Sequence, residues 1–176
     1  RRDSLTILSL PRLDLVVDDK EWEILETKRA EALSRGLLVT EKNDLVNARL
    51  EVDGKRYDAK IRLKGDYTDH LIGDKWSFRV KLDAGQSWDR MVVFSLQNPE
   101  TRDFLSDYVY HHFLQSEKIL TPRYEFVHLS MNGVSRGMYA LEEHFAKPLV
   151  ERNHRREGPI VKWNESGIWE VYATGG

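Results

Sequence analysis

The sequence predicts an α+β domain in which helices pack on a mainly antiparallel sheet, and three observations support this prediction. Two strand pairs surround Asp53-Gly54 and Asn132-Gly133, and both positions of such turns tolerate the positive φ that a tight hairpin requires. Between these hairpins, Thr101–Glu117 places apolar residues at helical spacing. At 176 residues, the chain is long enough for one domain, residues 1–176, with a sizeable core.

The beginning of the chain is expected to hold an edge strand followed by a helix. Leu5–Val17 alternates apolar and polar residues around a proline, which is typical of an edge strand because proline cannot donate to a ladder. Lys20–Arg35 is predicted to be a helix that Asp18 or Asp19 caps and Gly36 ends. The residues expected to face the core lie on one side of this helix: Trp22, Leu25, Ala32 and Leu33.

Three further segments in the first half have strand patterns. Asn47–Val52 and Lys55–Leu63 are predicted to pair around the Asp-Gly turn. Trp76–Leu82 alternates in period two, so one of its faces is apolar and the other is cationic. The cationic face presents Arg79 and Lys81.

The second half is predicted to contain a packed central helix, a hairpin and a late strand. Thr101–Glu117 is the expected central helix, with these residues at helical spacing: Phe104, Leu105, Tyr108, Val109, His112 and Phe113. Tyr124–Glu143 is the Asn-Gly hairpin, and Phe145–Arg152 is a short helix. Gly158–Trp163 is predicted to be a strand, and residues 164–176 are predicted to be a disordered end.

Composition excludes several function classes. Hydrophobic residues at 40% and charged residues at 32% describe a globular chain. Because 27 Lys and Arg nearly balance 29 Asp and Glu, no global field attracts nucleic acid or an anionic membrane. No apolar run approaches the ~18 residues of a membrane span. The chain has no Cys, so disulfides and thiolate sites are excluded, and no metal site is predicted.

Several motifs, taken in order, resemble the CotH family of spore-coat kinase-like proteins. The matching pieces are Tyr57–Gly65, Lys75–Leu82, Leu96-Gln97-Asn98 before a helix, Asn132-Gly133, Gly137-Met138-Tyr139 and Glu142. The resemblance spans most of Asp14–Lys162 and corresponds to the N-terminal portion of the family's domain. It implies a fold like the N-terminal lobe of a protein kinase. It also implies ATP and Mg²⁺ as cofactors, and phosphate transfer to protein Ser or Thr.

The candidate phosphate contacts are cationic side chains near the third and fourth predicted strands. Phosphoryl transfer requires cations around the triphosphate. Arg79 and Lys81 share a strand face, Lys75 precedes that strand, and Lys64 lies in the turn before it. The resemblance implies that Lys75 or Lys81 orients phosphates, and the pattern leaves the choice open. A solvated strand face is the alternative interpretation.

Carboxylates complete the predicted nucleotide site. A kinase lysine is normally held by a carboxylate on the following helix, and the candidates here are Asp103, Asp107 and Glu117, of which Asp107 is preferred. Glu142 is expected on the adenine side, and the alternative is a carboxylate at the start of a helix. Lys162 is expected either in the cleft or in solvent.

The resemblance places the family's metal-binding and catalytic acidic residues beyond Gly176, so this chain alone is expected to be an inactive lobe that requires the C-terminal half of the domain. The family also suggests an extracytoplasmic or spore-coat location and a protein substrate. The runner-up hypothesis is a non-catalytic module that docks a coat or envelope protein, and the acidic Asp66-Tyr67 turn favours it. A carbohydrate-binding β-module ranks third.

Overall fold

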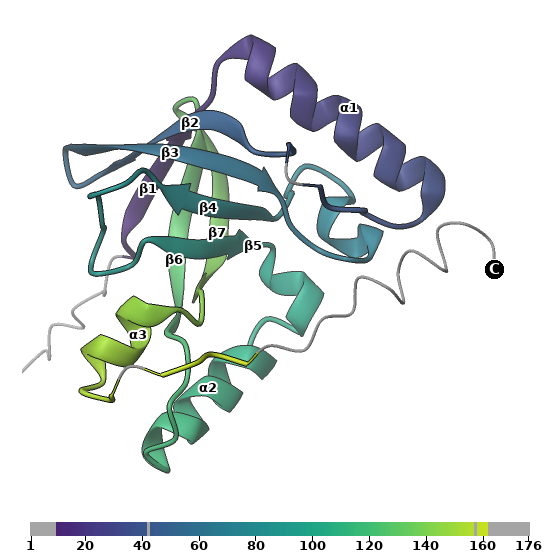
Figure 1. The fold of residues 1–176 in the computed structure, drawn as a ribbon. Coiled ribbons are helices and arrows are strands. Elements are labelled where there is room, and N and C mark those ends of the chain that lie inside the picture. The colour runs from purple at the N-terminus through teal and green to yellow at the C-terminus, as the bar shows by residue number, and fades with distance from the viewer. Residues whose placement is uncertain (1–9, 42, 157, 162–176) are drawn as a thin grey trace, which may run out of the picture.

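In this computed structural model, residues 10–41, 43–156 and 158–161 are described, and they form a closed barrel with helices outside it (Figure 1). The barrel order is β1-β2-β3-β4-β5-β7-β6. The strands are β1 (Arg12–Val16), β2 (Val46–Val52), β3 (Lys55–Leu63), β4 (Phe78–Leu82), β5 (Val93–Gln97), β6 (Tyr124–Met131) and β7 (Val134–Glu143). The helices are α1 (Asp19–Arg35), α2 (Ser106–Ser116) and α3 (Lys147–Arg152), with 3-10 turns η1 (Thr68–Leu71) and η2 (Pro99–Arg102).

The predicted fold class, an α+β lobe with packed helices, is wrong, because the sheet closes on itself. The strand β1 pairs antiparallel with β2 and parallel with β6, so it has a partner on both sides. The expected edge strand is therefore also wrong. The strand begins at Arg12, after Pro11, so the missing proline N–H lies outside the ladder. The carbonyl of Pro11 still accepts a hydrogen bond from the His128 amide at 2.8 Å.

The two predicted hairpins are confirmed. The turn residues Asp53 and Gly54 have φ of 49° and 72°, and β2 pairs along its full length with residues Lys55–Ile61 of β3. Asn132 and Gly133 have φ of 50° and 76° between β6 and β7. Alternate residues of the strands fill the barrel, among them Leu15, Leu50, Ile61, Val80, Phe94 and Leu129, all fully buried.

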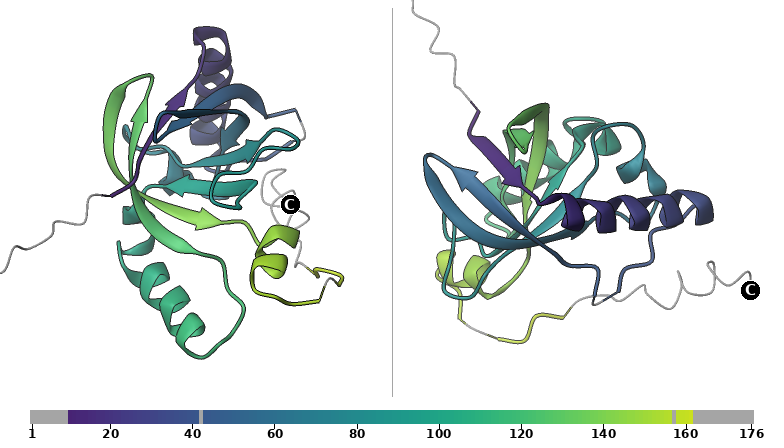
Figure 2. Two further views of the ribbon diagram at one scale, coloured as in Figure 1. Left: turned by 90° about the vertical axis from the view of Figure 1, so that its left-hand side faces the viewer. Right: turned by 90° about the horizontal axis from the view of Figure 1, so that it is seen from above.

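Helix α1 agrees with the sequence in its bounds and partly in its buried face. Gly36 ends it in the left-handed conformation with φ 76°, and Asp18 occupies the N-cap position without a side-chain hydrogen bond. Leu25 and Ala32 are buried as expected, whereas Leu33 is 38% exposed, so its assignment to the core is wrong. Figure 2 shows the helix lying across the outside of the barrel.

The prediction of a packed central helix is also wrong. The segment breaks into η2 and α2 because Asp103 and Phe104 adopt positive φ of 46° and 58°. No residue of α2 is buried. The side chains expected in the core are largely exposed instead: Phe104 46%, Leu105 56%, Val109 60% and Phe113 59%. Figure 1 shows α2 projecting from one end of the barrel.

The end of the described chain departs from the predicted strand. The short helix is confirmed as α3, beginning at Lys147 rather than at Phe145. Residues 158–161 have no regular secondary structure, so the predicted strand is absent from the described residues. The predicted disordered end, residues 164–176, lies outside the described residues.

Replacing Phe78 tests the assignment of the barrel interior. Phe78 is 2% exposed and belongs to the core, so Phe78→Ala is expected to lower the free energy of unfolding by about 3–5 kcal/mol. Chemical denaturation measures this change. Phe113→Ala is the matched control, because Phe113 is 59% exposed, and its cost is expected to stay below about 0.5 kcal/mol. Equal losses in the two variants would mean that the buried faces are misassigned.

Candidate functional site

A row of polar side chains crosses the outer face of the barrel. Register places Arg62 opposite Arg79, Arg79 opposite Ser95, Ser95 opposite Glu142, and Glu142 opposite Tyr124. Directly opposed residues of a sheet project from the same face. Their strand neighbours Ile61, Val80, Phe94 and Leu141 point into the core. The alternation that fills the barrel therefore gathers charges from β3, β4, β5 and β7 outside it.

Lys64 lies at the centre of this outer face. It follows the last residue of β3, and its Nζ donates to Glu142 Oε2 at 2.7 Å and to Gln97 Oε1 at 2.7 Å. The side chains of the ion pair are 19% and 29% exposed. Two hydrogen bonds thus fix the lysine head, and the third ammonium N–H can point to a ligand.

The pKa values of this pair reflect opposing effects. Burial alone raises the pKa of Glu142, but the adjacent Lys64 ammonium and the Arg79 guanidinium lower it more, so the pKa lies below its ordinary value. Burial lowers the pKa of Lys64, and Glu142 offsets only part of that shift, while Arg79 and Arg102 lower the pKa further. Glu142 therefore faces Lys64 and Arg79, while Arg102 is paired with Asp107, so three cations and two carboxylates leave the cluster with excess positive charge.

Arg79 links the cluster to the end of β7. Its Nη1 donates to His144 Nδ1, so that nitrogen is unprotonated. Burial lowers the pKa of Arg79, and its Nε is buried without a hydrogen-bond partner among the described residues. Burial also raises the pKa of Tyr124, next to Glu142 in the row, to about 12. A buried guanidinium with an unused donor is suited to an anionic or polar ligand.

A buried hydrogen-bond network holds the turn that carries Lys64. Gly65 adopts φ +120°, and a Cβ there would lie 2.6 Å from the ring of His70. His70 Nδ1 is 2.9 Å from Ser77 Oγ, which accepts the Asn98 amide at 3.1 Å. Asn98 in turn accepts the Glu100 amide and begins η2, which ends at Arg102. The same network thus positions Lys64 and Arg102.

The structure brings together three of the predicted site residues and separates others. Lys64, Arg79 and Glu142 belong to the cluster, and the ion pair of Asp107 is with Arg102 at 3.5 Å. The carboxylate that holds a lysine here is thus Glu142, on a strand. Asp107 as a nucleotide-site residue stays a prediction.

Lys75 and Lys81 lie away from Lys64. The Lys75 amine is 3.5 Å from the Met138 carbonyl, in the middle of β7. Lys81 is exposed on the outer face of β4 and makes no hydrogen bond or ion pair with the described residues. Lys162 lies outside the described residues. Whether any of these lysines contacts phosphate stays a prediction.

A cavity of about 570 Å³ adjoins the cluster and shares Glu142 with it. Its polar lining consists of Arg79, Ser95, Glu142, Glu143, His144, Arg155 and Arg156. Its apolar side consists of Leu120, Pro122, Phe145, Val150, Ile160 and Val161. An apolar hollow with a few converging polar groups is the usual form of a small-molecule site.

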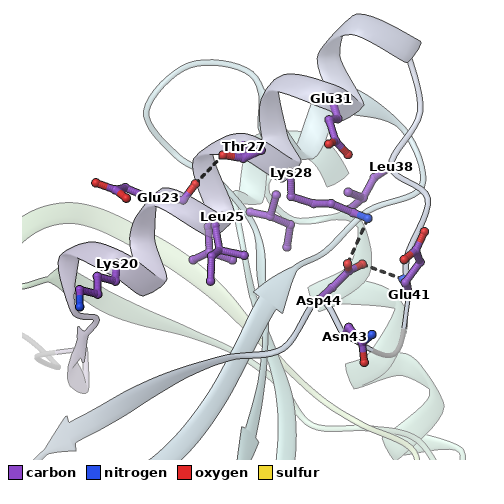
Figure 3. A pocket seen from close by; sticks show the side chains of 12 residues that line it. Lys20, Glu23, Leu25, Thr27, Lys28, Glu31, Leu38, Glu41, Asn43 and Asp44 are labelled. Atoms are coloured by element: carbon purple, nitrogen blue, oxygen red, sulfur yellow. Dashed lines mark hydrogen bonds and ion pairs between the residues drawn. The ribbon is translucent and has the colours of Figure 1, made fainter.

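A second cavity of about 580 Å³ lies between α1 and residues 38–44 (Figure 3). Lys28 Nζ contacts Asp44 Oδ1 at 3.0 Å across it, and Asp44 Oδ2 accepts the Glu41 amide at 2.7 Å. None of the predicted site residues lines it. The cavity beside Glu142 is therefore the better candidate for a functional site.

The described residues contain neither a metal-binding group of side chains nor a membrane-spanning helix. Within residues 10–41, 43–156 and 158–161, no three His, Asp or Glu side chains are grouped to hold a metal ion. Among the helices of these ranges, none has the length and apolar character needed to cross a bilayer.

The sequence of residues 61–173 matches a family model described as CotH kinase protein. This match covers more than half of the chain. The chain belongs to the CotH family. The resemblance seen in its motifs is thereby confirmed, and the matched range includes Lys64, Arg79 and Glu142. A search of curated proteins finds no match to this chain.

Sequence reasoning missed several residues of the cluster. The Leu96-Gln97-Asn98 motif contains Gln97 but does not predict that Gln97 binds Lys64, and no sequence pattern predicts that Arg102 belongs to the cluster. The signal for Gln97 was its position two residues after Ser95 on an otherwise apolar strand, which places both polar side chains on one face. His70 and Ser77 gave no such signal, because a buried pair of this kind depends on how the turn folds back.

Glu142→Gln tests whether the ion pair stabilises the fold. Leaving the Lys64 ammonium without its counter-charge is expected to lower the free energy of unfolding at pH 7 by about 1–3 kcal/mol. Folding lowers the pKa of Glu142 from its ordinary 4.5, so its contribution is present above that value and is lost as pH falls through the folded pKa. Denaturation at pH 7 and in mild acid measures both effects.

Glu125→Gln is the matched control for Glu142→Gln, since Glu125 is exposed on β6 and has no ion pair with the described residues. It is expected to leave stability at pH 7 unchanged. If Glu142→Gln loses stability in acid as steeply as the wild type, the acid sensitivity belongs to another group.

Gly65→Ala tests the tight turn after Lys64. The new Cβ would meet the His70 ring at 2.6 Å and adopt an unfavourable φ of +120°, so a loss of roughly 2–4 kcal/mol is expected. Gly73→Ala is the control, because Gly73 has φ +69° with open space around it, and its cost should be about 1 kcal/mol. Thermal and chemical unfolding give the comparison, and similar costs at both positions would show that His70 yields easily.

Proposed function

We propose that this chain supplies the nucleotide-binding part of a CotH-type protein kinase, which transfers phosphate from ATP to Ser or Thr of a protein. The observation that supports this proposal best is the Lys64–Glu142 ion pair at 2.7 Å, in a cluster with excess positive charge beside an apolar cavity. A lysine fixed by a glutamate is the arrangement by which kinases hold ATP phosphates.

The charges of the cluster fit a triphosphate. Arg79 and Arg102 both act electrostatically on Lys64, and Glu142 interacts with Lys64 and Arg79. Arginine can bind phosphate oxygens in a bidentate manner, and lysine binds them as a point charge. The cavity has a volume of about 570 Å³, and its apolar side can pack against the faces of a nucleobase. Glu142 is then shared by the base side and the phosphate side.

The proposal assigns ATP, but not Mg²⁺, to the described residues. No three carboxylate or imidazole groups of the described residues are placed together as metal ligands. The oxygen atoms nearest Lys64, Glu142 Oε2 and Gln97 Oε1, both accept hydrogen bonds from its ammonium group, which would compete with a metal ion for them. We therefore assign no metal ligand to the described residues and derive no step through the metal.

A specific observation also favours the docking module as a second function. Helix α2 has no buried residue, and exposed apolar side chains lie on it and at its N-cap: Leu105, Val109, Tyr110 and Phe113. Exposed apolar surface of this kind is typical of protein–protein contacts. This function requires no nucleotide, so ATP binding distinguishes it from the kinase proposal.

Calorimetric titration of Mg-ATP into the protein tests the kinase proposal. Saturable binding is expected, and Lys64→Ala is expected to weaken it at least about tenfold, because the fixed ammonium contacts phosphate. Lys55→Ala is the matched control, since Lys55 is exposed at the start of β3, far along the strand from Lys64. Absence of binding to the wild type, or equal affinity of the two variants, would contradict the proposal.

A further inference from the structure

A ladder of four cations runs along the outer face of β3 and β4. Lys60 is directly opposite Lys81, and Arg62 is directly opposite Arg79. Their neighbours along the two strands are buried in the barrel: Ala59, Ile61, Val80 and Leu82. Because side chains alternate along a strand, all four cations point outward. We call Lys60, Arg62, Arg79 and Lys81 the cationic ladder.

Opposed like charges of this kind are unfavourable in a sheet. Directly opposite side chains have Cβ atoms about 5 Å apart, and like charges there destabilise the pair. The ladder contains two such pairs in succession, although the chain as a whole has 27 basic and 29 acidic residues. Overall charge therefore does not account for this local excess.

The described residues neutralise only part of the ladder. Arg62 donates to Thr40 Oγ1 at 2.9 Å and Arg79 donates to His144. Glu142 acts electrostatically on Arg79, and Asp44 and Asp66 act on Arg62. Lys60 and Lys81 are exposed and form no ion pair with a carboxylate of the described residues. Asp44, which acts on Arg62 at a distance, is paired with Lys28. Burial also lowers the pKa of both arginines, so an anion beside them would favour their charged forms.

We propose that the cationic ladder binds a chain of linked phosphates, with Lys60 and Lys81 as direct contacts in addition to Lys64. The inference rests on the proposed function, because Arg79 belongs both to the ladder and to the candidate nucleotide cavity. The two rows of the ladder lie about 7 Å apart along the strands, which suits an extended polyanion better than a single phosphate. Lys60 and Arg62 thereby become phosphate-site residues, and Lys81 is favoured over Lys75.

The test is a titration of inorganic tripolyphosphate into the full chain and into two double variants. Lys60→Ala/Lys81→Ala is expected to weaken tripolyphosphate binding at least about tenfold and to reduce its dependence on salt. The control is Lys20→Ala/Lys55→Ala, which removes the same charge from exposed lysines outside the ladder and is expected to change affinity less than about twofold. If both double variants bind tripolyphosphate equally weakly, the proposal that the cationic ladder binds linked phosphates is contradicted.

A melting curve without ligand gives an independent readout. Removing opposed like charges should leave the melting temperature of Lys60→Ala/Lys81→Ala equal to that of the wild type or above it. A lower melting temperature would overturn the claim that the opposed lysines repel each other.

Titration of Mg-ATP separates this inference from the proposed function. We expect ATP to displace tripolyphosphate from the wild type, and ATP affinity to fall in the ladder variant as well as in Lys64→Ala. If ATP binding depends on Lys64 but not on Lys60 and Lys81, the proposal that the cationic ladder binds phosphates is wrong, whereas the proposed function is supported. If tripolyphosphate binds through the cationic ladder but ATP does not bind at all, the phosphate-binding role of the ladder is supported and the proposed function is contradicted.

Discussion

The rest of the structure depends on the parallel pairing of β1 with β6. This pairing closes the sheet, because β1 already pairs with β2 on its other side. The side chain of Asn132 strengthens the junction, since its Oδ1 accepts the Val17 amide at 2.8 Å and its Nδ2 donates to the Val17 carbonyl at 2.9 Å. The same asparagine thus forms the hairpin turn and ties its tip to the strand that completes the barrel.

Closure determines where charge can lie. A closed barrel has one interior, and alternate residues such as Ile61 and Val80 fill it, so every second residue of β3 and β4 must face outward. Because neighbouring strands are in register, outward residues from distant parts of the chain meet. Lys64 and Glu142 are 78 residues apart in sequence, yet their charged atoms are 2.7 Å apart. The candidate site is therefore a consequence of the barrel's register.

Part of the site could be predicted from the sequence. Period-two alternation placed Arg79 and Lys81 on one polar face, and the motifs identified the family and singled out Lys64 and Glu142. The pairing of those two residues was not predicted, because a kinase-like arrangement was expected to use a helical carboxylate. Asp107 lies on α2, but its ion pair is with Arg102. Which groups meet across several strands depends on register, and no local pattern contains that information.

By itself, the sequence determined the features that follow from local sterics and hydrogen bonding. Positive φ at Asp53-Gly54 and Asn132-Gly133 makes two tight hairpins, and Gly36 ends α1 in the left-handed conformation. Only the tertiary structure decided that the sheet closes and that α2 leaves its apolar residues exposed. The physical reason is that helical spacing and strand alternation state which residues share a face, whereas the partner of each face is chosen by contacts between segments far apart in the chain.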